Sequence, residues 1–366
     1  MRVRPAVAQM PAYNPPLEGR SDKDYLLLDF SESTIPPSPQ VLEALHAYLR
    51  GGRLQMYPSY GTLRDKVARY AGTRPEQVLL TNGSDSAIQL ILQALLEPGD
   101  EMVLARPHFF ILGATALSLG ARVVSPQYHA DMSYPYEEVL AAITERTRVV
   151  VIINPNNPTG TSVGLQQVEE LLRRHPRVAV FVDEAYYEFS HNTVVPLLER
   201  YDNLVISRTF SKAQAIAGLR FGYALSNAEF IAQLHKLRIP YDVNSMAVVA
   251  AEASLDHPEP WQAYVREVME QSKPLVERFL TEHGVPFFHS DCNFILVQAG
   301  DPQAATEFLK EHDILVRPQR PPVEQCFRVS LGTVEQMRSF LRAFSSYLDR
   351  IQWVPQAHQA MGHARG

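Results

Sequence analysis

The sequence contains very little cysteine, because Cys292 and Cys326 are the only two among 366 residues. They form no CxxC pair, which excludes a disulfide framework and favours a reducing compartment. Long apolar runs are also missing, and the short apolar stretch near the basic N-terminus is interrupted by Pro5 and Pro11. Neither a signal peptide nor a membrane span is therefore recognisable, and we expect a cytoplasmic protein.

A strong excess of charge of one sign is absent as well. Lysine and arginine total 34 against 40 aspartate and glutamate, which gives a net charge of −6. We therefore expect no broad cationic surface for nucleic acid or for an anionic membrane. The 12 histidines show no ligand spacing, so no metal site is expected either. Hydrophobic residues reach 46%, enough for a large core, and the length predicts two or three domains.

Short apolar runs alternate with amphipathic stretches from residue 78 onward, a pattern typical of an α/β fold. Several runs are continuous Val/Ile/Leu segments, as in a mostly parallel sheet covered by helices on both faces. The predicted strands cover residues 78–80, 101–105, 122–124, 149–153, 178–182, 204–207 and 221–225.

The alternation stops near residues 240–244, which divides the chain into four parts. We predict an N-terminal arm (1–35) and a large α/β domain (36–244). A smaller α+β domain (245–353) and a flexible tail (354–366) follow. The arm contains one strand-like piece at residues 25–30, and the small domain contains strands predicted at 293–298, 314–317 and 326–330.

Five of the predicted strands end in unusual polar residues, at 81–85, 107–110, 154–160, 183–186 and 207–212. Any one such cluster is equally compatible with an ordinary polar loop. Ligands of open parallel sheets bind beyond the carboxyl ends of the strands, so five clusters on one edge favour a shared site.

The stretch Gly83-Ser84-Asp85 precedes an amphipathic helix and could cradle a phosphate with free backbone N–H groups. A simple N-cap by Ser84 or Asp85 is the alternative. Charge-assisted hydrogen bonds could complete an anion cup, from Arg220 together with the hydroxyls of Thr209 and Ser211. Taken alone, an arginine beside a glycine is most often structural.

Three motifs, read in chain order, resemble the signature of the fold-type I aminotransferases, which hold pyridoxal 5′-phosphate (PLP) on a lysine as a Schiff base. They are Asn154–Gly160, Asp183-Glu184-Ala185-Tyr186, and Ser211-Lys212-Ala213 with Ala217-Gly218-Leu219-Arg220. The resemblance spans about residues 25–348 and is closest to the histidinol-phosphate aminotransferase group, through Tyr57-Pro58 and the stretch 328–333 as well. It implies an α/β fold with a large PLP-binding domain, a mostly parallel central sheet and a smaller α+β domain.

The resemblance also implies roles for individual residues. Lys212 would carry PLP and then move a proton during the reaction, and Asp183 would keep the pyridine nitrogen protonated. Arg328, with Asn157, would bind the substrate anion. The remaining cofactor contacts would come from Gly83, Ser84, Asp85, Phe109, Asn157, Tyr186, Thr209, Ser211 and Arg220. Taken alone, Asn157 is an ordinary turn residue, Tyr186 and Phe109 are core aromatics, and Arg328 is an exposed strand arginine.

In that family the Tyr57 position reaches the cofactor phosphate of the neighbouring subunit, so the resemblance implies a homodimer. Without it, Tyr57 is a loop aromatic. The chain departs from the family at Ser31-Glu32-Ser33-Thr34, where Asn-Glu-Asn-Pro is usual, at Phe109, where tyrosine is common, and at Gln214, where phenylalanine is common.

We therefore expect a ping-pong aminotransferase that acts on L-histidinol phosphate and 2-oxoglutarate. The alternatives are transamination of an aromatic or other amino acid and decarboxylation of a phosphorylated amino acid. A non-catalytic PLP-fold protein is a further alternative.

Overall fold

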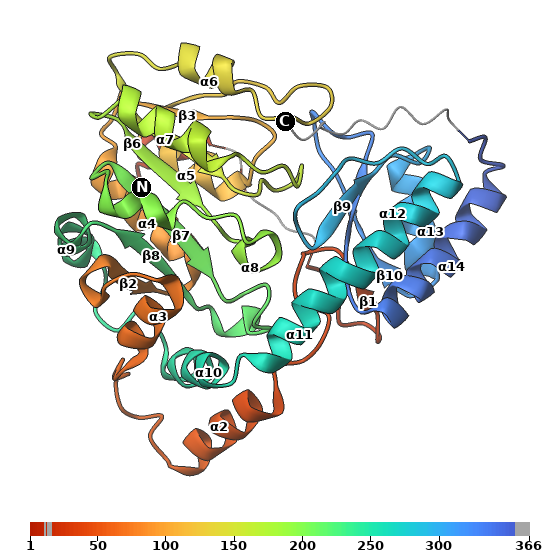
Figure 1. Cartoon of the computed structure of the whole chain (residues 1–366), viewed down its shortest axis with the longest axis horizontal. Coiled ribbons are helices and arrows are strands. Elements are labelled where there is room, and N and C mark those ends of the chain that lie inside the picture. The colour runs from red at the N-terminus through yellow and green to blue at the C-terminus, as the bar shows by residue number, and fades with distance from the viewer. Residues whose placement is uncertain (11, 13–16, 356–366) are drawn as a thin grey trace.

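The computed structural model describes residues 1–10, 12 and 17–355, and Figure 1 shows its two bodies. A large body contains the central sheet, and a smaller one contains strand β9 and helices α12, α13 and α14. The predicted flexible tail, residues 354–366, lies outside the described residues apart from its first two.

Seven strands form the central sheet within the described residues, and all of them run parallel except β8. This confirms the predicted mostly parallel sheet. In sheet order the strands are β2 (Val78–Thr81), β8 (Gly222–Ser226), β7 (Leu204–Thr209), β6 (Ala179–Asp183), β5 (Thr147–Ile153), β3 (Glu101–Leu104) and β4 (Arg122–Val124).

Continuous apolar strands arise because helices cover both faces of this sheet. In β5, Val150 and Ile152 belong to one hydrophobic core, whereas Val149, Val151 and Ile153 belong to the other. Successive side chains of a strand point to opposite faces, so a strand buried on both sides needs apolar residues at every position.

Each core has its own helices. The first is covered by α2 (Pro39–Arg50), α3 (Leu63–Ala71), α7 (Leu165–Arg174) and α10 (Ser245–Asp256). The second is covered by α4 (Gly83–Leu95), α5 (Phe110–Ser118) and α9 (Ala228–Leu237). The remaining helices of this body are α1 (Pro5–Ala8), α6 (Tyr136–Ala141) and α8 (Tyr187–Ser190).

The smaller body is built on an antiparallel sheet of three strands among the described residues. Its order is β11 (Arg317–Pro318), β12 (Phe327–Ser330) and β9 (Phe294–Val297). Its helices are α11 (Glu259–Glu267), α12 (Lys273–Glu282), α13 (Pro302–Glu311) and α14 (Val334–Arg350).

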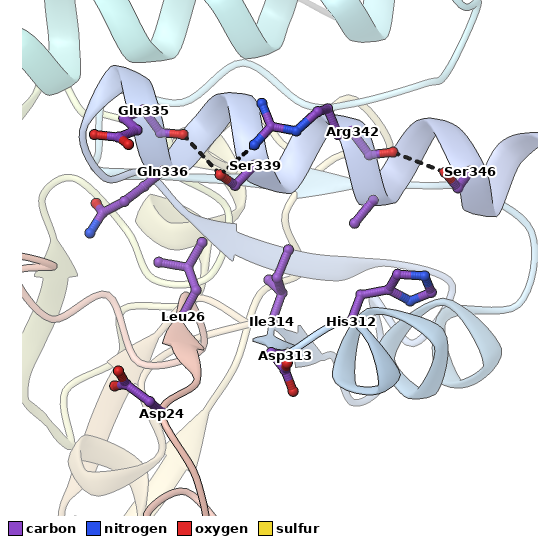
Figure 2. Close-up of a pocket in the computed structure, with 11 residues that line it drawn as sticks. Asp24, Leu26, His312, Asp313, Ile314, Glu335, Gln336, Ser339, Arg342 and Ser346 are labelled. Carbon is purple, nitrogen blue, oxygen red and sulfur yellow. Dashed lines mark hydrogen bonds between the residues drawn. The ribbon is translucent and has the colours of Figure 1, made fainter.

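The N-terminal arm docks on the smaller body. Its strand β1 (Leu26–Leu27) pairs in parallel with β10 (Ile314–Leu315), and Figure 2 shows Leu26 and Ile314 side by side below α14. The strand predicted at residues 314–317 is divided, since Ile314 and Leu315 pair with the arm whereas Arg317 pairs with β12.

Helix α10 packs against α2 and α3 of the large body. Its buried residues Ala247, Val248, Ala250 and Ala251 belong to the first hydrophobic core of the sheet. We expected the small domain to begin at residue 245. Because the packing of α10 joins it to the large core, we propose that the boundary lies after Asp256 instead.

Candidate active site

The polar clusters meet at one edge of the central sheet, because β2, β3, β5, β6 and β7 all run in the same direction. The antiparallel strand β8 brings Arg220, which precedes it, to the same edge. The cleft there has a cavity volume of about 130 Å³. It is lined by Ser84, Asp85, Phe109, Asn157, Asp183, Tyr186, Thr209, Ser211, Lys212 and Arg220, with Ile153 and Ala185.

Asp183 is the last residue of β6, and only 3% of it is exposed. Its Oδ1 accepts a hydrogen bond of 2.7 Å from the Ser207 hydroxyl. Burial raises the pKa of Asp183 to about 6. An ionised carboxylate at this depth needs a cationic partner, and a protonated pyridine nitrogen has the right charge.

Asn157 and Tyr186 form the next contact around the cleft. The Asn157 Nδ2 donates to the Tyr186 Oη over 2.9 Å. Burial raises the pKa of Tyr186, so its hydroxyl stays protonated at neutral pH and can donate a hydrogen bond. Phe109 lies half-buried at the start of α5 and contributes an aromatic ring to the lining.

Lys212 follows β7, and its Nζ donates a hydrogen bond of 3.0 Å to the main-chain oxygen of Phe30 in the arm. Burial, together with the positive charge of Arg328, lowers the pKa of Lys212 to about 8. A substantial part of the amine is therefore neutral near physiological pH and can act as a nucleophile or a base.

The predicted anion cup is assembled around the first turn of α4. Arg220 Nη2 lies 2.9 Å from Asp85 Oδ2, and Nη1 lies 3.4 Å from the Ser211 hydroxyl, which also accepts from Thr209 Oγ1 over 2.9 Å. Gly83 has a positive φ of 75°, and a Cβ there would lie 2.7 Å from Arg220 Nη2. Only glycine fits this approach, and Gly83 places the guanidinium beside the free N–H groups of the helix start.

Arg328 reaches the cleft from the small domain. Arg328 is only 7% exposed. Its Nη1 donates a hydrogen bond to Asn157 Oδ1 over 2.5 Å, and its Nη2 donates to the main-chain oxygen of Asp29 over 2.9 Å. It is therefore not an exposed strand arginine. Its bonds join the arm, the small domain and the large domain at one point.

Two further arginines stand near this point that sequence reasoning missed. Arg317 is the β11 partner of Arg328, and its guanidinium lies 4.9 Å from the centre of the Phe30 ring. Arg20 lies 4.6 Å from the same ring. No motif marked either residue, because their proximity depends on how the arm and strand β11 pack against each other.

Tyr57 does not reach the cleft of its own chain. It is 79% exposed and stacks on Tyr241, with ring centres 4.5 Å apart. The role in a neighbouring subunit's site therefore stays a prediction.

A larger hollow lies elsewhere, between α14 and the paired strands β1 and β10 (Figure 2). Its polar side chains bond locally. Arg342 donates to Ser339 over 2.9 Å, and Ser339 and Ser346 donate to main-chain oxygens of their own helix. The hollow is lined by none of the residues predicted for the site.

The cleft contains a neutralisable lysine, a buried carboxylate and an anion cup at a helix start, which together define a PLP-dependent enzyme. The family described as aminotransferase class I and II matches residues 23–344. The chain belongs to this family and is a PLP-dependent aminotransferase of fold type I.

The chain is similar to several aminotransferases with known names. It is 36% identical to a histidinol-phosphate aminotransferase of Geobacillus sp. (strain WCH70), over 97% of this chain and 100% of that protein. It is 35% identical to a dihydroxyacetone phosphate transaminase of Campylobacter jejuni, over 87% and 88%. A crystal structure of histidinol-phosphate aminotransferase from Sinorhizobium meliloti in complex with pyridoxal-5′-phosphate superposes with a TM-score of 0.86 at 25% identity, covering 96% and 98%.

The residues of the cleft fit PLP. Asp183 has no basic side chain as an ion-pair partner among the described residues, and the space in front of Gly83 would be filled by any larger side chain. When bound, PLP supplies an electron sink for the carbon that carries the amino group. Asp183 would hold the ring nitrogen, Lys212 the aldehyde carbon, and the cup around Arg220 the phosphate.

None of the helices in residues 1–10, 12 and 17–355 combines the length and the apolar content that a bilayer crossing requires. The same residues contain no group of three or more histidine, cysteine or acidic side chains placed to hold a metal ion.

Proposed function

We propose that this aminotransferase transfers the amino group of L-histidinol phosphate to 2-oxoglutarate, giving imidazole-acetol phosphate and L-glutamate. The observation that supports the proposal is the pair of arginines Arg328 and Arg317, which lie opposite each other on paired strands, with Arg328 bonded to Asn157 of the cleft. Guanidinium groups bind phosphate through charge-assisted, often bidentate, hydrogen bonds. The 36% identity to a histidinol-phosphate aminotransferase supports the same substrate.

Arg328 would accept the phosphate of the donor in one half-reaction and a carboxylate of the keto acid in the other. Such a shared site suits ping-pong kinetics, because the two substrates occupy it in turn. Arg328 is also held by Asn157, whose amide touches Tyr186, so a bound anion would be aligned with the cofactor side of the cleft.

Lys212 would perform the proton transfer. Its neutral amine, favoured by burial, would take the proton from the donor carbon and return a proton to the cofactor side. The buried Tyr186 hydroxyl would donate a hydrogen bond to the cofactor's ring oxygen, and Asp183 would keep the opposite nitrogen protonated.

Dihydroxyacetone phosphate is a second candidate acceptor, favoured by the 35% identity to a transaminase that bears its name. It is also a phosphate ester, so the same two arginines would bind it. An aromatic amino acid as donor would use Arg328 for its carboxylate alone. Decarboxylation of a phosphorylated amino acid would need a different bond of the substrate aligned over the same cofactor.

The test is a single-turnover experiment with the PLP-loaded enzyme and no keto acid. L-histidinol phosphate, L-phenylalanine and a phosphorylated amino acid are mixed with it separately while the cofactor absorbance is followed. We expect rapid change with L-histidinol phosphate and one equivalent of imidazole-acetol phosphate. Faster change with phenylalanine would move the enzyme to aromatic substrates, and release of CO2 would show decarboxylation. Dihydroxyacetone phosphate is then compared with 2-oxoglutarate as acceptor.

We further propose a cytoplasmic homodimer. Apolar side chains are exposed together on α2 and on the two loops that carry Tyr57 and Tyr241, as expected for an interface; they are Leu42, Leu49, Leu54, Met56 and Ile239. Both cysteines are free and buried, which suits a reducing compartment. Light scattering after size-exclusion chromatography would test the dimer, and a monomeric mass with full activity would contradict it.

A further inference from the structure

The arm residue Arg20 holds two acidic side chains at once. Its Nη2 lies 3.0 Å from Asp29 Oδ1 and 2.5 Å from Glu32 Oε2. The guanidinium also covers one face of the Phe30 ring, and the side chain is only 16% exposed. Arg20 is therefore an ion-pair partner shared by the two carboxylates at the ends of residues 29–32.

This segment, residues 29–32, contacts two of the predicted site residues through its main chain. Its main-chain oxygens at two successive residues accept hydrogen bonds from the functional cations: Asp29 from Arg328 over 2.9 Å and Phe30 from Lys212 over 3.0 Å. Glu32 lines a cavity that it shares with Ser211 of the anion cup. The main chain that carries Asp29 and Glu32 thus lies beside the cations that an anionic substrate must reach.

The main chain of the segment is already fixed without Arg20. Ser330 N donates to Leu28 O over 2.8 Å, the Ser330 hydroxyl accepts from Ser31 N over 2.9 Å, and Asn293 donates to Ser31 O over 3.3 Å. Arg20 therefore contributes mainly a positive charge beside the carboxylates of Asp29 and Glu32. Within the described residues, neither Asp29, which is 5% exposed, nor Glu32 has another basic partner in an ion pair.

We propose that Arg20 is a positioning residue for the substrate-anion site, which holds the carboxylates of Asp29 and Glu32 away from Arg328 and Lys212 and so leaves those cations to the substrate. A freed carboxylate on the segment would pair with the nearest cation and compete with the substrate's phosphate or carboxylate. Consistent with this, the negative charge of Glu32 already raises the pKa of Lys212, against the larger effect of burial. The inference rests on the proposed role of Arg328 as the anion-binding residue.

The test measures KM for 2-oxoglutarate and the inhibition constant of inorganic phosphate with the PLP-loaded enzyme. We expect Arg20→Met to raise both constants about tenfold while kcat changes less than about threefold, because ground-state and transition-state binding are weakened alike. The triple variant R20M/D29N/E32Q should return both constants to within about threefold of the parent enzyme, since it has no carboxylates left to compete. For Arg20→Lys, both constants should lie between those of the parent enzyme and those of R20M.

Lys23→Met is the matched control, because Lys23 is in the same arm and pairs with Asp313 at the surface, away from the cleft. Its KM should match the parent enzyme. A triple variant as impaired as R20M would mean that Arg20 is merely structural and would overturn the inference, as would an R20M variant with the parent KM.

Arg328→Gln separates this inference from the proposed function. An unchanged KM in R328Q would overturn the anion site and the inference together, whereas a raised KM in R328Q beside an unchanged KM in R20M would overturn the inference alone. If R20M does not fold, Arg20→Lys decides. Lysine lacks the guanidinium that pairs with both carboxylates, so KM for 2-oxoglutarate should rise, and an R20K variant with the parent KM would contradict the proposal.

Discussion

The guanidinium of Arg328 bridges the two bodies of the protein by donating to Asn157 Oδ1 over 2.5 Å, across 171 positions of sequence. The arginine lies on the small-domain strand β12, and the asparagine follows strand β5 of the central sheet. Substrate anions bound by Arg328 would therefore be aligned with the cofactor pocket by the packing of the two bodies on each other.

We predict that Arg328→Lys raises KM for both substrates by about tenfold to a hundredfold, because lysine keeps the charge but loses the two-pronged contact. Steady-state kinetics with L-histidinol phosphate and with 2-oxoglutarate would measure the change. Equal KM values in the variant and the parent enzyme would contradict the predicted anion site.

Lys212 should titrate near pH 8 in the cofactor-free protein. Its pKa is lowered from 10.5 to about 8, mainly by burial. Because the lowered pKa favours the neutral amine, about 10% of Lys212 would be neutral at pH 7 and half at pH 8. The pH dependence of its modification by an amine reagent, read by peptide mass spectrometry, would give the midpoint.

Substitution of two charged neighbours, Arg328 and Glu32, should shift the titration midpoint of Lys212 in opposite directions. Arg328 lowers the pKa of Lys212, so Arg328→Gln should move the midpoint to higher pH. Glu32 raises it, so Glu32→Gln should move the midpoint to lower pH. An unchanged midpoint in both variants would mean that Lys212 is not near these charges.

Asp183→Asn should stabilise the cofactor-free protein at alkaline pH while it abolishes most transaminase activity. The folded pKa of Asp183 is raised from 3.8 to about 6, so the fold favours the protonated acid. Stability is therefore lost as pH rises through 6, and the asparagine variant should not show that loss. The difference at pH 8 should reach about 2 to 3 kcal/mol at most.

Urea denaturation of the cofactor-free protein at pH 5 and pH 8 would measure this effect. Excess PLP should reverse the order, because only the parent protein gains an ionic partner for its carboxylate. If the free energy of unfolding changed with pH in the same way for both proteins, burial would not raise the pKa of Asp183.

The ion pair between Arg208 and Glu184 lies directly behind the site and is almost fully buried, with side chains 2% and 0% exposed. Glu184 also accepts hydrogen bonds from Thr193 and from the main chain of Val194. Arg208→Met should destabilise the fold by about 3 to 5 kcal/mol, because it leaves a buried carboxylate without its cation. The double variant R208M/E184L should be less destabilised than R208M alone, and the opposite order would contradict the charge argument.

The central sheet followed largely from sequence. Continuous Val, Ile and Leu in β5 and β6 predicted strands buried on both faces, and polar residues at the strand ends predicted where the cleft would lie. These signals are local, since each depends on a strand, its period of two and the turn that follows. The antiparallel direction of β8, which brings Arg220 to the same edge, follows from pairing and was not readable from its residues.

The packing of the helix near the proposed domain boundary depends on contacts that the sequence does not show. Residues 245–256 form an apolar helix that could belong to either body, and only its contacts with α2 and α3 place it in the large core. The strand at 314–317 is similarly divided, because its two halves pair with different strands.

By itself the sequence determined the fold class and the family, and it predicted the lysine, the carboxylate and the helix start of the site, because these depend on short motifs with fixed spacing. Only the tertiary structure decided which distant side chains meet. Arg20, Phe30, Arg317 and Arg328 converge through strand pairing and docking between segments some 300 residues apart, and such contacts leave no periodic signal in the chain. The cofactor was therefore readable from the sequence, whereas the surroundings of the substrate required the folded protein.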